Sequence, residues 1–539
     1  MAYPKFISYA EHCAAAQAAF KVNDFAGAAE IYRGIPEAFP GKKHAATFAA
    51  EGLLACGQWS DAVLVLQRAL ERFKGGVSIL SHLSRACLIG GDPGRAAFYL
   101  RRFLDHDPRD IRQWRQLGDL YVQAGELSEA LFSYNKVLAA EPLNVETAIL
   151  RGDILADLGR AEEAIADYRR TEAIEPGNTV VAFKLGTLAL KMGTPREAAD
   201  HLRRAIAADP GNADAHVTLS LALISLGLYD DAARLAAAGL DLQPGFALGQ
   251  FALGMALTGL ERFVQASEAL KLAADASPTS LDVLTALAEA EVGRGDLFAA
   301  ERALQQVLSV DPDNSGARFM IAALHGEALE FAPPELAVAT FDREAPRYDY
   351  VAGSLQDYAA AEAGATLLED AEPARASFQS VADLGCGTGL AVAALRDAFR
   401  IDSATGIDVS EKMIEFAAKK NLYDRLVIGD AIGMLDALNE DFELITAVDL
   451  APHLGRLSTL TTAVARHLVP GGLFLCSIEH TDAAGYQLRP SGRFAHDTGY
   501  LEETAQAAGL EILARRDLAL RRIGGRPLKG LVALFRRPH

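Results

Sequence analysis

Apolar residues recur at helical spacing through the first 330 residues, and the whole pattern repeats every 34 residues. Alanine marks the same position of every repeat: Ala28, Ala62, Ala96, Ala130, Ala164, Ala198, Ala232, Ala266 and Ala300. Proline follows eight of these alanines by twelve residues, with Lys74 in the remaining repeat: Pro40, Pro108, Pro142, Pro176, Pro210, Pro244, Pro278 and Pro312. Glycine precedes seven of them by five residues, with Asn23 and Glu261 in the other two: Gly57, Gly91, Gly125, Gly159, Gly193, Gly227 and Gly295. Three registers that agree in this way predict an array of helix pairs.

Each of the three positions has a physical reason in a pair of helices. Glycine suits the turn between the two helices, where the backbone adopts a positive φ. Alanine suits the point where the helices cross closely, and proline ends the second helix of the pair. The unit from Ile111 to Asn144 shows the pattern most completely, with Trp114, Leu117, Gly118, Tyr121, Gly125, Ala130, Tyr134 and Pro142.

These residues resemble the tetratricopeptide repeat (TPR) family over nine units, from Tyr9 to Asn314. The half-unit Ser315 to Leu329 resembles the capping helix of such an array. The resemblance implies an all-α TPR solenoid over residues 1–330, with a concave face that holds peptides or partner proteins. Candidates for that face are polar residues of the first helices: Arg112, Arg115, Gln116, Asp119, Asp153, Lys184, Thr187 and Lys191. Their charges are mixed, and ordinary solvated positions are the alternative interpretation.

A second pattern begins after Phe331-Ala332-Pro333-Pro334, where the 34-residue register stops. Short apolar runs then alternate with helical patterns, which predicts a doubly wound parallel sheet. The expected strands are Val381–Leu384, Ala404–Asp408, Leu426–Ala431, Phe442–Val448, Leu473–Ile478, Glu511–Arg515 and Leu531–Phe535. We therefore expect a Rossmann-like, seven-stranded α/β domain over residues 331–539, which ends in a hairpin.

The first of these strands leads into a glycine-rich turn and a helix. The turn reads G-x-G-x-G at Gly385, Gly387 and Gly389, with Asp383 two residues before the first glycine. Glycines allow a close approach of the backbone to a ligand, and the helix end offers unpaired N–H groups to it. The pattern resembles motif I of class I S-adenosylmethionine (SAM) methyltransferases. That resemblance implies SAM as the cofactor, with contacts from Asp383, Gly385, Cys386, Gly387 and Gly389.

Further cofactor contacts are expected at the ends of the next strands. Asp408 lies 19 residues after Gly389, where a carboxylate can accept hydrogen bonds from both ribose hydroxyls. Asp430 resembles the family's contact to the adenine amino group, although an acidic strand end is also common on protein surfaces. The segment Phe341–Asp349 reads F-D-x-x-A-x-x-Y-D and resembles the first helix of several small-molecule SAM methyltransferases. By that resemblance Tyr348 covers the methionine end of the cofactor; plain packing is the alternative.

The loop after the fourth strand, Asp449 to Gly455, occupies the place of the family's motif IV, beside the transferred methyl group. This implies Asp449 as a further cofactor contact. The loop sequence differs from the N/D-P-P-Y/F motif of enzymes that methylate amino groups of nucleic acids. Pro470-Gly471-Gly472, ahead of the fifth strand, is another feature of the family.

Candidate catalytic residues lie in the loops at the strand ends. Methyl transfer from a sulfonium is an in-line displacement that depends on positioning and needs no metal. An acceptor with a high pKa also needs a base within hydrogen-bond reach. The candidates are His453 and His496, followed by the weaker Glu479 and Asp449. Arg489 and Arg493 are candidates to hold a substrate carboxylate or phosphate; stabilising a loop is the alternative role for each.

Composition limits the classes of partner. The net charge of −19 disfavours nucleic acids, which basic surfaces usually bind. Five scattered cysteines form no C-x-x-C pair, which is typical of reduced thiols. Residues Met1 to Phe20 lack a signal pattern, and the longest apolar run, Val217 to Leu228, is shorter than the ~18 residues of a membrane span. We expect a cytoplasmic protein with no membrane partner.

Three functions remain open from the sequence. The stretch Arg489 to His496, with Gly524 to Gly530 after it, resembles bacterial class I methyltransferases that carry TPR repeats, so the resemblance spans almost the whole chain. The leading function is SAM-dependent methyl transfer, with the array recruiting a protein as substrate or partner. The second is a small-molecule methyltransferase whose array serves assembly only. The third is a non-catalytic scaffold with a SAM-sensing domain, which the intact glycine motif and Asp408 disfavour.

Overall fold

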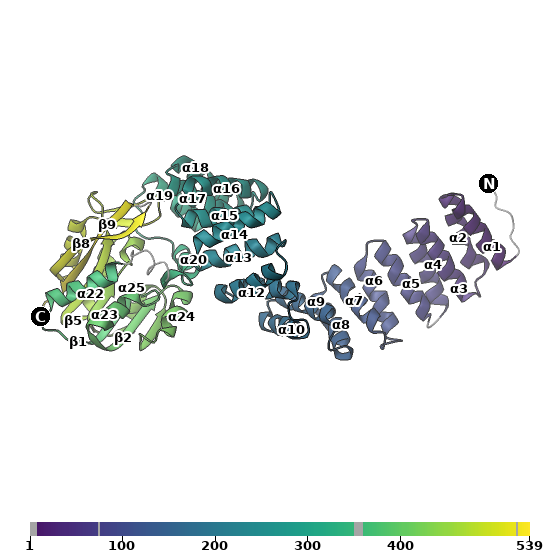
Figure 1. The fold of residues 1–539 in the computed structure, drawn as a ribbon, viewed down its shortest axis with the longest axis horizontal. Helices are drawn as coiled ribbons and strands as arrows, with labels where there is room; N and C mark the ends of the chain where they lie inside the picture. Colours follow the sequence, from purple (N-terminus) through teal and green to yellow (C-terminus); the bar gives the residue numbers. More distant parts are fainter. Residues whose placement is uncertain (1–7, 74–75, 350–358, 524–525) are drawn as a thin grey trace. The chain divides into compact units, whose positions relative to one another are not determined.

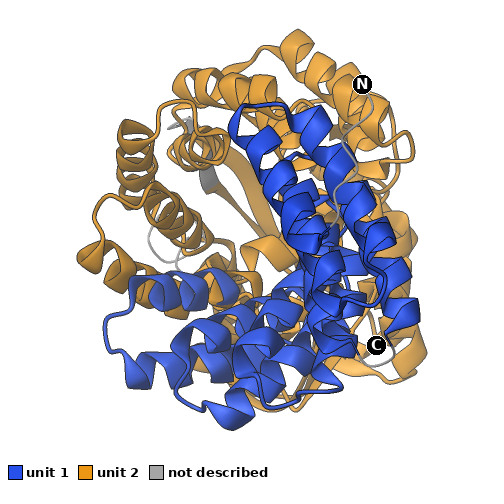
Figure 2. Cartoon of the chain, turned by 90° about the vertical axis from the view of Figure 1, so that its right-hand side faces the viewer, with its two compact units in different colours: residues 1–188 blue, residues 189–539 orange. Residues whose placement is uncertain are grey.

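The computed structural model describes residues 8–73, 76–349, 359–523 and 526–539 (Figure 1). The chain forms two compact units, Met1–Leu188 and Ala189–His539 (Figure 2). The division falls inside helix α11 (Thr179–Lys191), within the repeat array. The expected functional boundary at residues 330 and 331 stays a prediction, because the end of the array and the sheet region belong to the same compact unit.

Helix pairs build the array, as the 34-residue register predicts. In the first unit the helices are α1 (Tyr9–Lys21), α2 (Phe25–Ala38), α3 (Lys43–Ala55), α4 (Trp59–Arg72), α5 (Val77–Ile89), α6 (Pro93–Leu104), α7 (Ile111–Gln123), α8 (Leu127–Ala140), α9 (Val145–Asp157) and α10 (Ala161–Ile174). In the second they are α12 (Pro195–Ala208), α13 (Ala213–Ser225), α14 (Tyr229–Leu242), α15 (Ala247–Gly259), α16 (Phe263–Ala276), α17 (Leu281–Arg294), α18 (Leu297–Val310) and the final helix α19 (Ser315–His325).

The repeat positions take the conformations that their residue types predict. The nine register alanines are fully buried, and all seven register glycines adopt a positive φ. Asn23 and Glu261, which replace glycine, adopt the same left-handed conformation, with φ of 62° and 56°. The register prolines follow the ends of the second helices, and the expected exception Lys74 lies outside the described residues.

A seven-stranded sheet follows, in the order β3-β2-β1-β4-β5-β9-β8. All neighbours are parallel except β9, which is antiparallel to both β5 and β8. The strands are β1 (Ser377–Leu384), β2 (Arg400–Asp408), β3 (Arg425–Ile428), β4 (Phe442–Ala447), β5 (Leu468–Glu479), β8 (Glu511–Ile523) and β9 (Arg526–Arg536). The Pro-Gly-Gly turn lies inside β5, next to a register shift against β4, rather than before the strand. The expected hairpin strands are longer than predicted, and residues 524–525 lie outside the description.

Apolar cores cover both faces of the sheet. Helices α22 (Ala359–Ala371) and α23 (Leu390–Ala398) pack on one face. Helices α25 (Ala431–Leu438), α26 (Ser458–His467) and α27 (Thr498–Ala507) pack on the other. Helices α20 (Pro334–Glu344) and α24 (Glu411–Lys419) contact each other beside the sheet. The helical run predicted to reach Leu368 crosses residues 350–358, which lie outside the description.

A short hairpin is the element that the sequence did not predict. Strands β6 (Tyr486–Leu488) and β7 (Phe494–His496) pair between β5 and α27, where we expected a loop. Leu488 and Phe494 of this hairpin share a buried apolar cluster with Phe319 and Ala323 of α19. Among the helices that the structure describes, none has the length and apolar character needed to cross a membrane.

Candidate functional site

A cavity of about 400 Å³ opens at the carboxyl ends of the parallel strands. The glycine turn after β1, the ends of β2 and β3, and the loop after β4 form one part of its lining. The segment before and within α20 forms the other part. The lining residues are Phe331, Ala332, Pro334, Ala337, Phe341, Tyr348, Gly385, Gly387, Asp408, Val409, Met413, Asp430, Ala431, Ile432, Leu450, His453 and Leu454.

The glycine turn has a backbone that only glycine adopts without strain. Gly385, Gly387 and Gly389 have φ of 67°, 53° and 94°. A Cβ added at Gly387 would meet no atom nearer than the Tyr348 ring, at 3.9 Å, so the turn borders open space there. Gly389 is the N-cap of α23, which directs the unpaired N–H groups of that helix toward the turn.

Asp408 lines the cavity at the end of β2 and is tied to the glycine turn. Its carboxylate accepts hydrogen bonds from the backbone N–H of Gly387, at 2.8 Å, and of Ser410, at 2.9 Å. Burial raises the pKa of this carboxyl group, and the backbone donors oppose that effect. A carboxylate offers about four acceptor positions, so the two backbone bonds leave it able to accept ligand hydroxyls.

Asp383 and Cys386 lie beneath the turn, outside the cavity lining. Asp383 is 1% exposed and accepts hydrogen bonds from the hydroxyls of Tyr423 and Thr446, both at 2.6 Å. Burial raises its pKa to about 6. Burial also raises the pKa of the Cys386 thiol well above its usual range. These two predicted cofactor contacts do not border the cavity, and Asp383 links the turn to β4 and Tyr423.

The F-D-x-x-A-x-x-Y-D segment is fastened to the sheet region by both of its aspartates. Asp342 accepts hydrogen bonds from the Ser410 hydroxyl, at 2.5 Å, and from the backbone N–H of Lys412 at the start of α24. Asp349 accepts one from the Thr388 hydroxyl, at 2.5 Å, and pairs with Lys420. Sequence reasoning singled out only Tyr348 here, which does line the cavity. The signal that could have revealed these two contacts is the pair of acidic residues, Asp342 and Asp349, in the same segment.

Asp430 and His453 also line the cavity. Asp430 caps α25, where its side chain accepts a hydrogen bond from the N–H of Gly433 at 2.7 Å. His453 ends the 3₁₀ turn η1 (Ala451–His453), and its ring lies edge-on to Phe341 with centroids 4.9 Å apart. The Nε2 atom of His453 is 3.2 Å from a guanidinium nitrogen of Arg493.

The two predicted substrate arginines form an internal cluster instead of lining the cavity. Arg493 donates to Glu479 at 2.7 Å and to Asp449 at 2.6 Å, and Arg489 donates to Glu479 at 3.2 Å. Glu479 is only 2% exposed, so it needs these cationic partners. Asp449 likewise is absent from the cavity lining and has a left-handed backbone, with φ of 61°. These ion pairs fit the loop-stabilising alternative for Arg489 and Arg493, and their substrate role stays a prediction.

His496 is also outside the cavity lining. It is fully buried in β7, and its Nε2 lies 2.8 Å and 3.1 Å from the carbonyl oxygens of Leu454 and Gly455. Those carbonyls accept, so Nε2 carries a proton in this arrangement. Burial lowers the pKa of His496. The position removes the geometric basis for His496 as the general base and leaves His453 as the candidate.

Sequence reasoning missed the apolar wall formed by Phe331, Ala332, Pro334 and Ala337. These residues follow α19, and we interpreted the two prolines only as a domain boundary. The backbone oxygen of Glu330 accepts hydrogen bonds from Gly455, at 2.8 Å, and Arg456, at 3.2 Å. The boundary segment therefore packs onto the loop that follows His453.

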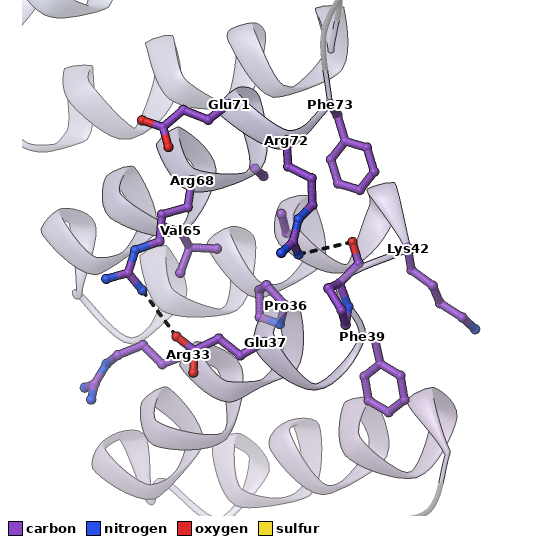
Figure 3. A pocket seen from close by; sticks show the side chains of 13 residues that line it. Arg33, Pro36, Glu37, Phe39, Lys42, Val65, Arg68, Glu71, Arg72 and Phe73 are labelled. Carbon is purple, nitrogen blue, oxygen red and sulfur yellow. Dashed lines mark hydrogen bonds and ion pairs between the residues drawn. The ribbon is translucent and has the colours of Figure 1, made fainter.

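The first unit carries a separate groove of about 650 Å³ between α2 and α4 (Figure 3). Val65, Pro36 and small residues border its centre, and charged side chains surround it. Its described lining holds four cationic side chains, Arg33, Lys42, Arg68 and Arg72, and two carboxylates, Glu37 and Glu71. Arg68 pairs with Glu37, whereas Arg72 donates to the neutral carbonyl oxygen of Pro40.

The polar first-helix candidates of the array are partly engaged with their own neighbours. Arg115 forms a bidentate pair with Glu146. Asp119 accepts a hydrogen bond from Tyr134, and Asp153 accepts one from Tyr168, both at 2.6 Å. Lys184 pairs with Asp153 at 2.8 Å. These contacts link adjacent helices, so stabilising the array is one function of the residues.

Comparison with known families matches three segments of the chain. Residues 381–472 match a methyltransferase domain family. Residues 115–179 and 189–252 match two tetratricopeptide repeat families. The chain therefore contains tetratricopeptide repeats followed by a methyltransferase domain. None of the curated proteins matches the sequence.

The similar solved structures include chains described as tetratricopeptide repeat proteins. The MamA protein is 28% identical, with 31% of this chain and 90% of that chain covered and a TM-score of 0.29. A tetratricopeptide repeat protein from Parabacteroides merdae ATCC 43184 is 15% identical, with 46% and 98% covered and a TM-score of 0.39. YrrB, described as a TPR protein with an unusual peptide-binding site, is 22% identical, with 34% and 95% covered and a TM-score of 0.30.

Proposed function

We propose that the methyltransferase domain transfers a methyl group from SAM, and that the repeat array recruits a protein as substrate or partner. The proposal of methyl transfer from SAM rests on the position of Asp408, which lines the cavity while its carboxylate accepts a hydrogen bond from the N–H of Gly387. The turn, the acidic strand end and the cavity together provide a place for a nucleoside beside a close backbone.

The residues that line the cavity fit SAM by their chemistry. Asp408 would accept hydrogen bonds from the ribose hydroxyls, and Asp430 would accept one from the adenine amino group. Ile432 and Met413 offer apolar surface for a planar base. Tyr348, Gly385 and Gly387 border the end where the methionine part would lie. SAM, when bound, supplies a methyl group on a positively charged sulfur, which is also the leaving group.

His453 is the residue best placed to act on a methyl acceptor. It lines the cavity, and a guanidinium nitrogen of Arg493 lies 3.2 Å from its Nε2. Because Arg493 can only donate, Nε2 is the acceptor and the ring proton lies on Nδ1 in this arrangement. With its proton on Nδ1, His453 would orient an acceptor group as a hydrogen-bond donor, and it could take a proton only if Arg493 releases Nε2.

The recruiting role of the array has its own support. The groove between α2 and α4 combines an apolar centre with more cationic than acidic side chains, which fits an acidic peptide segment. The first-helix face is the second candidate surface. A small-molecule enzyme whose array serves assembly is the competing function, and a non-catalytic SAM sensor is the third.

The first experiment is calorimetric titration of SAM into the wild type and into Asp408→Ala. We expect micromolar binding by the wild type and a loss of at least tenfold in the variant, because the ribose would lose its charged acceptor. Asp402→Ala is the matched control: Asp402 lies on the same strand, pairs with the exposed Arg400 and is absent from the cavity lining. No binding by the wild type would overturn the enzyme proposal.

A further inference from the structure

We propose that residues 327–333, the junction between α19 and α20, form a wall of the SAM cavity whose position controls SAM binding. We further propose that the Glu330–Arg456 ion pair holds this wall in position. The proposal rests on the proposed function of the cavity. It makes the end of the repeat array a part of the methyl-transfer site.

The junction is fixed to the loop after His453 by its backbone. Glu330 accepts two backbone hydrogen bonds, from Gly455 and Arg456, and Phe331 forms an antiparallel bridge with Leu454. A Cβ on Gly455 would lie 2.7 Å from the carbonyl oxygen of Leu329. Only glycine permits this approach, so residue 455 sets how closely the two segments lie.

Side chains fix the same junction from two directions. Arg456 pairs with the Glu330 carboxylate at the junction itself. Further back, Phe319 of α19 packs with Phe494 of the β6–β7 hairpin, with ring centroids 6.3 Å apart. Gly492, at the tip of that hairpin, lies against Met320. The last helix of the array is thus held against the same part of the methyltransferase domain as the junction.

These anchors control the position of the cavity lining. Phe331 and Ala332 line the cavity directly, and Leu454, the bridge partner of Phe331, immediately follows His453. A displacement of the junction therefore moves the apolar wall and the candidate base together. At its far end, α20 is held by Asp342 on Ser410, next to Asp408. The junction fixes the other end of this wall, at the start of α20.

The ion pair allows a test that leaves the fold intact. The side chains of Arg456 and Glu330 are 52% and 42% exposed, and exposed pairs contribute little to stability. In the full-length protein, Glu330→Arg or Arg456→Glu alone places like charges at the anchor. We expect each to weaken SAM binding about three- to tenfold, and the double charge swap to restore affinity to within about twofold. Hydrogen exchange of residues 450–457 should rise in the single variants and return in the swap.

The same exchange of charges at Arg515 and Glu502 provides the control, because that exposed pair contains no cavity-lining residue. It should leave SAM affinity unchanged. Gly455→Val is a second probe, with a larger expected loss of affinity because its side chain would collide with the Leu329 carbonyl and with the Tyr486 and Phe494 rings of the hairpin. If the wild type binds SAM and both single variants bind it with the affinity of the wild type, the wall proposal is overturned and the proposed function stands. Faster exchange without loss of affinity would also overturn it. A wild type that does not bind SAM removes both proposals.

Discussion

At the scale of single residues, Asp383 shows how the glycine turn is built. A carboxyl group that is 1% exposed would be costly if charged, and two hydroxyl donors compensate only part of that cost. The result is a pKa raised to about 6 from an ordinary value of 3.8. Asp383 is therefore a positioning residue whose charge changes just below neutral pH.

The raised pKa predicts a pH-dependent stability with a definite sign. Between about pH 4 and pH 6 the folded protein binds the Asp383 proton more tightly than the unfolded chain does. This contribution is fully present below the ordinary pKa and is lost as the pH rises through 6. Asp383→Asn cannot titrate. The free energy of unfolding of the wild type, relative to the variant, should fall on the order of 3 kcal/mol from pH 4 to pH 7.

Pulse proteolysis in urea measures this difference in the methyltransferase domain. Fluorescence is unsuitable because both tryptophans, Trp59 and Trp114, lie in the first unit of the array. A difference between the two proteins that stays constant with pH would mean that Asp383 has an ordinary pKa.

The sequence predicted which residues gather around the glycine turn better than it predicted which of them face the cavity. Gly385, Gly387 and Asp408 line it, because residues at the carboxyl end of a parallel strand and in the turn after it lie at the edge of the sheet where the cavity opens. Asp383 and Arg493 do not, because burial and partner choice depend on residues distant in sequence. Tyr423, 40 residues after Asp383, and Glu479 leave no local signal of these pairings.

At the scale of elements, the turns between paired helices test the repeat rule. Glu261 adopts φ of 56° where seven other repeats have glycine. A side chain in this conformation costs roughly 1–2 kcal/mol. Replacing the residue with glycine removes this strain, but part of the gain is offset because glycine loses more conformational freedom on folding. Asn23 pays less, because asparagine tolerates the left-handed region.

We therefore predict that Glu261→Gly stabilises the array locally by about 0.5–1 kcal/mol. Native-state hydrogen exchange in α15 and α16, on either side of the turn, measures the effect. Gly227→Ala is the matched opposite: Gly227 has φ of 76°, a backbone conformation that alanine adopts only with strain. It should destabilise α13 and α14 by about 1 kcal/mol. Equal exchange in Glu261→Gly and the wild type would contradict the rule.

Long elements were predictable and short ones were not. Nine repeats of a 34-residue register and seven strands carry enough periodic positions to stand out from the sequence. Strands β6 and β7 have three residues each, too few for alternation to be visible. The hairpin packs against Phe319, which is more than 160 residues away in the chain, so its position leaves no local sequence signal.

At the scale of the whole molecule, the division into two compact units separates the ligand from the fluorophores. SAM is proposed to bind in the second unit, while Trp59 and Trp114 report on the first. At a SAM concentration of 100 times its Kd, the second unit should gain about 2.7 kcal/mol. The urea midpoint by pulse proteolysis should rise, and the tryptophan transition should stay unchanged.

A parallel rise of both transitions would show that the two units unfold together. The sequence could not predict this division, because the helical register continues without change across residues 188 and 189. Which repeats unfold as one unit depends on the packing between them.

The reactivity of the buried Cys386 thiol can be used to measure how often the glycine turn opens. A thiol reacts as thiolate, and burial keeps Cys386 protonated, so modification requires the turn to open. Cys476, inside β5 with a pKa raised to about 12, requires the sheet to open as well. We expect a disulfide reagent to modify Cys386 before Cys476, and SAM to slow the first reaction selectively. The rate at Cys386 would then measure how often the glycine turn opens, without any knowledge of the methyl acceptor.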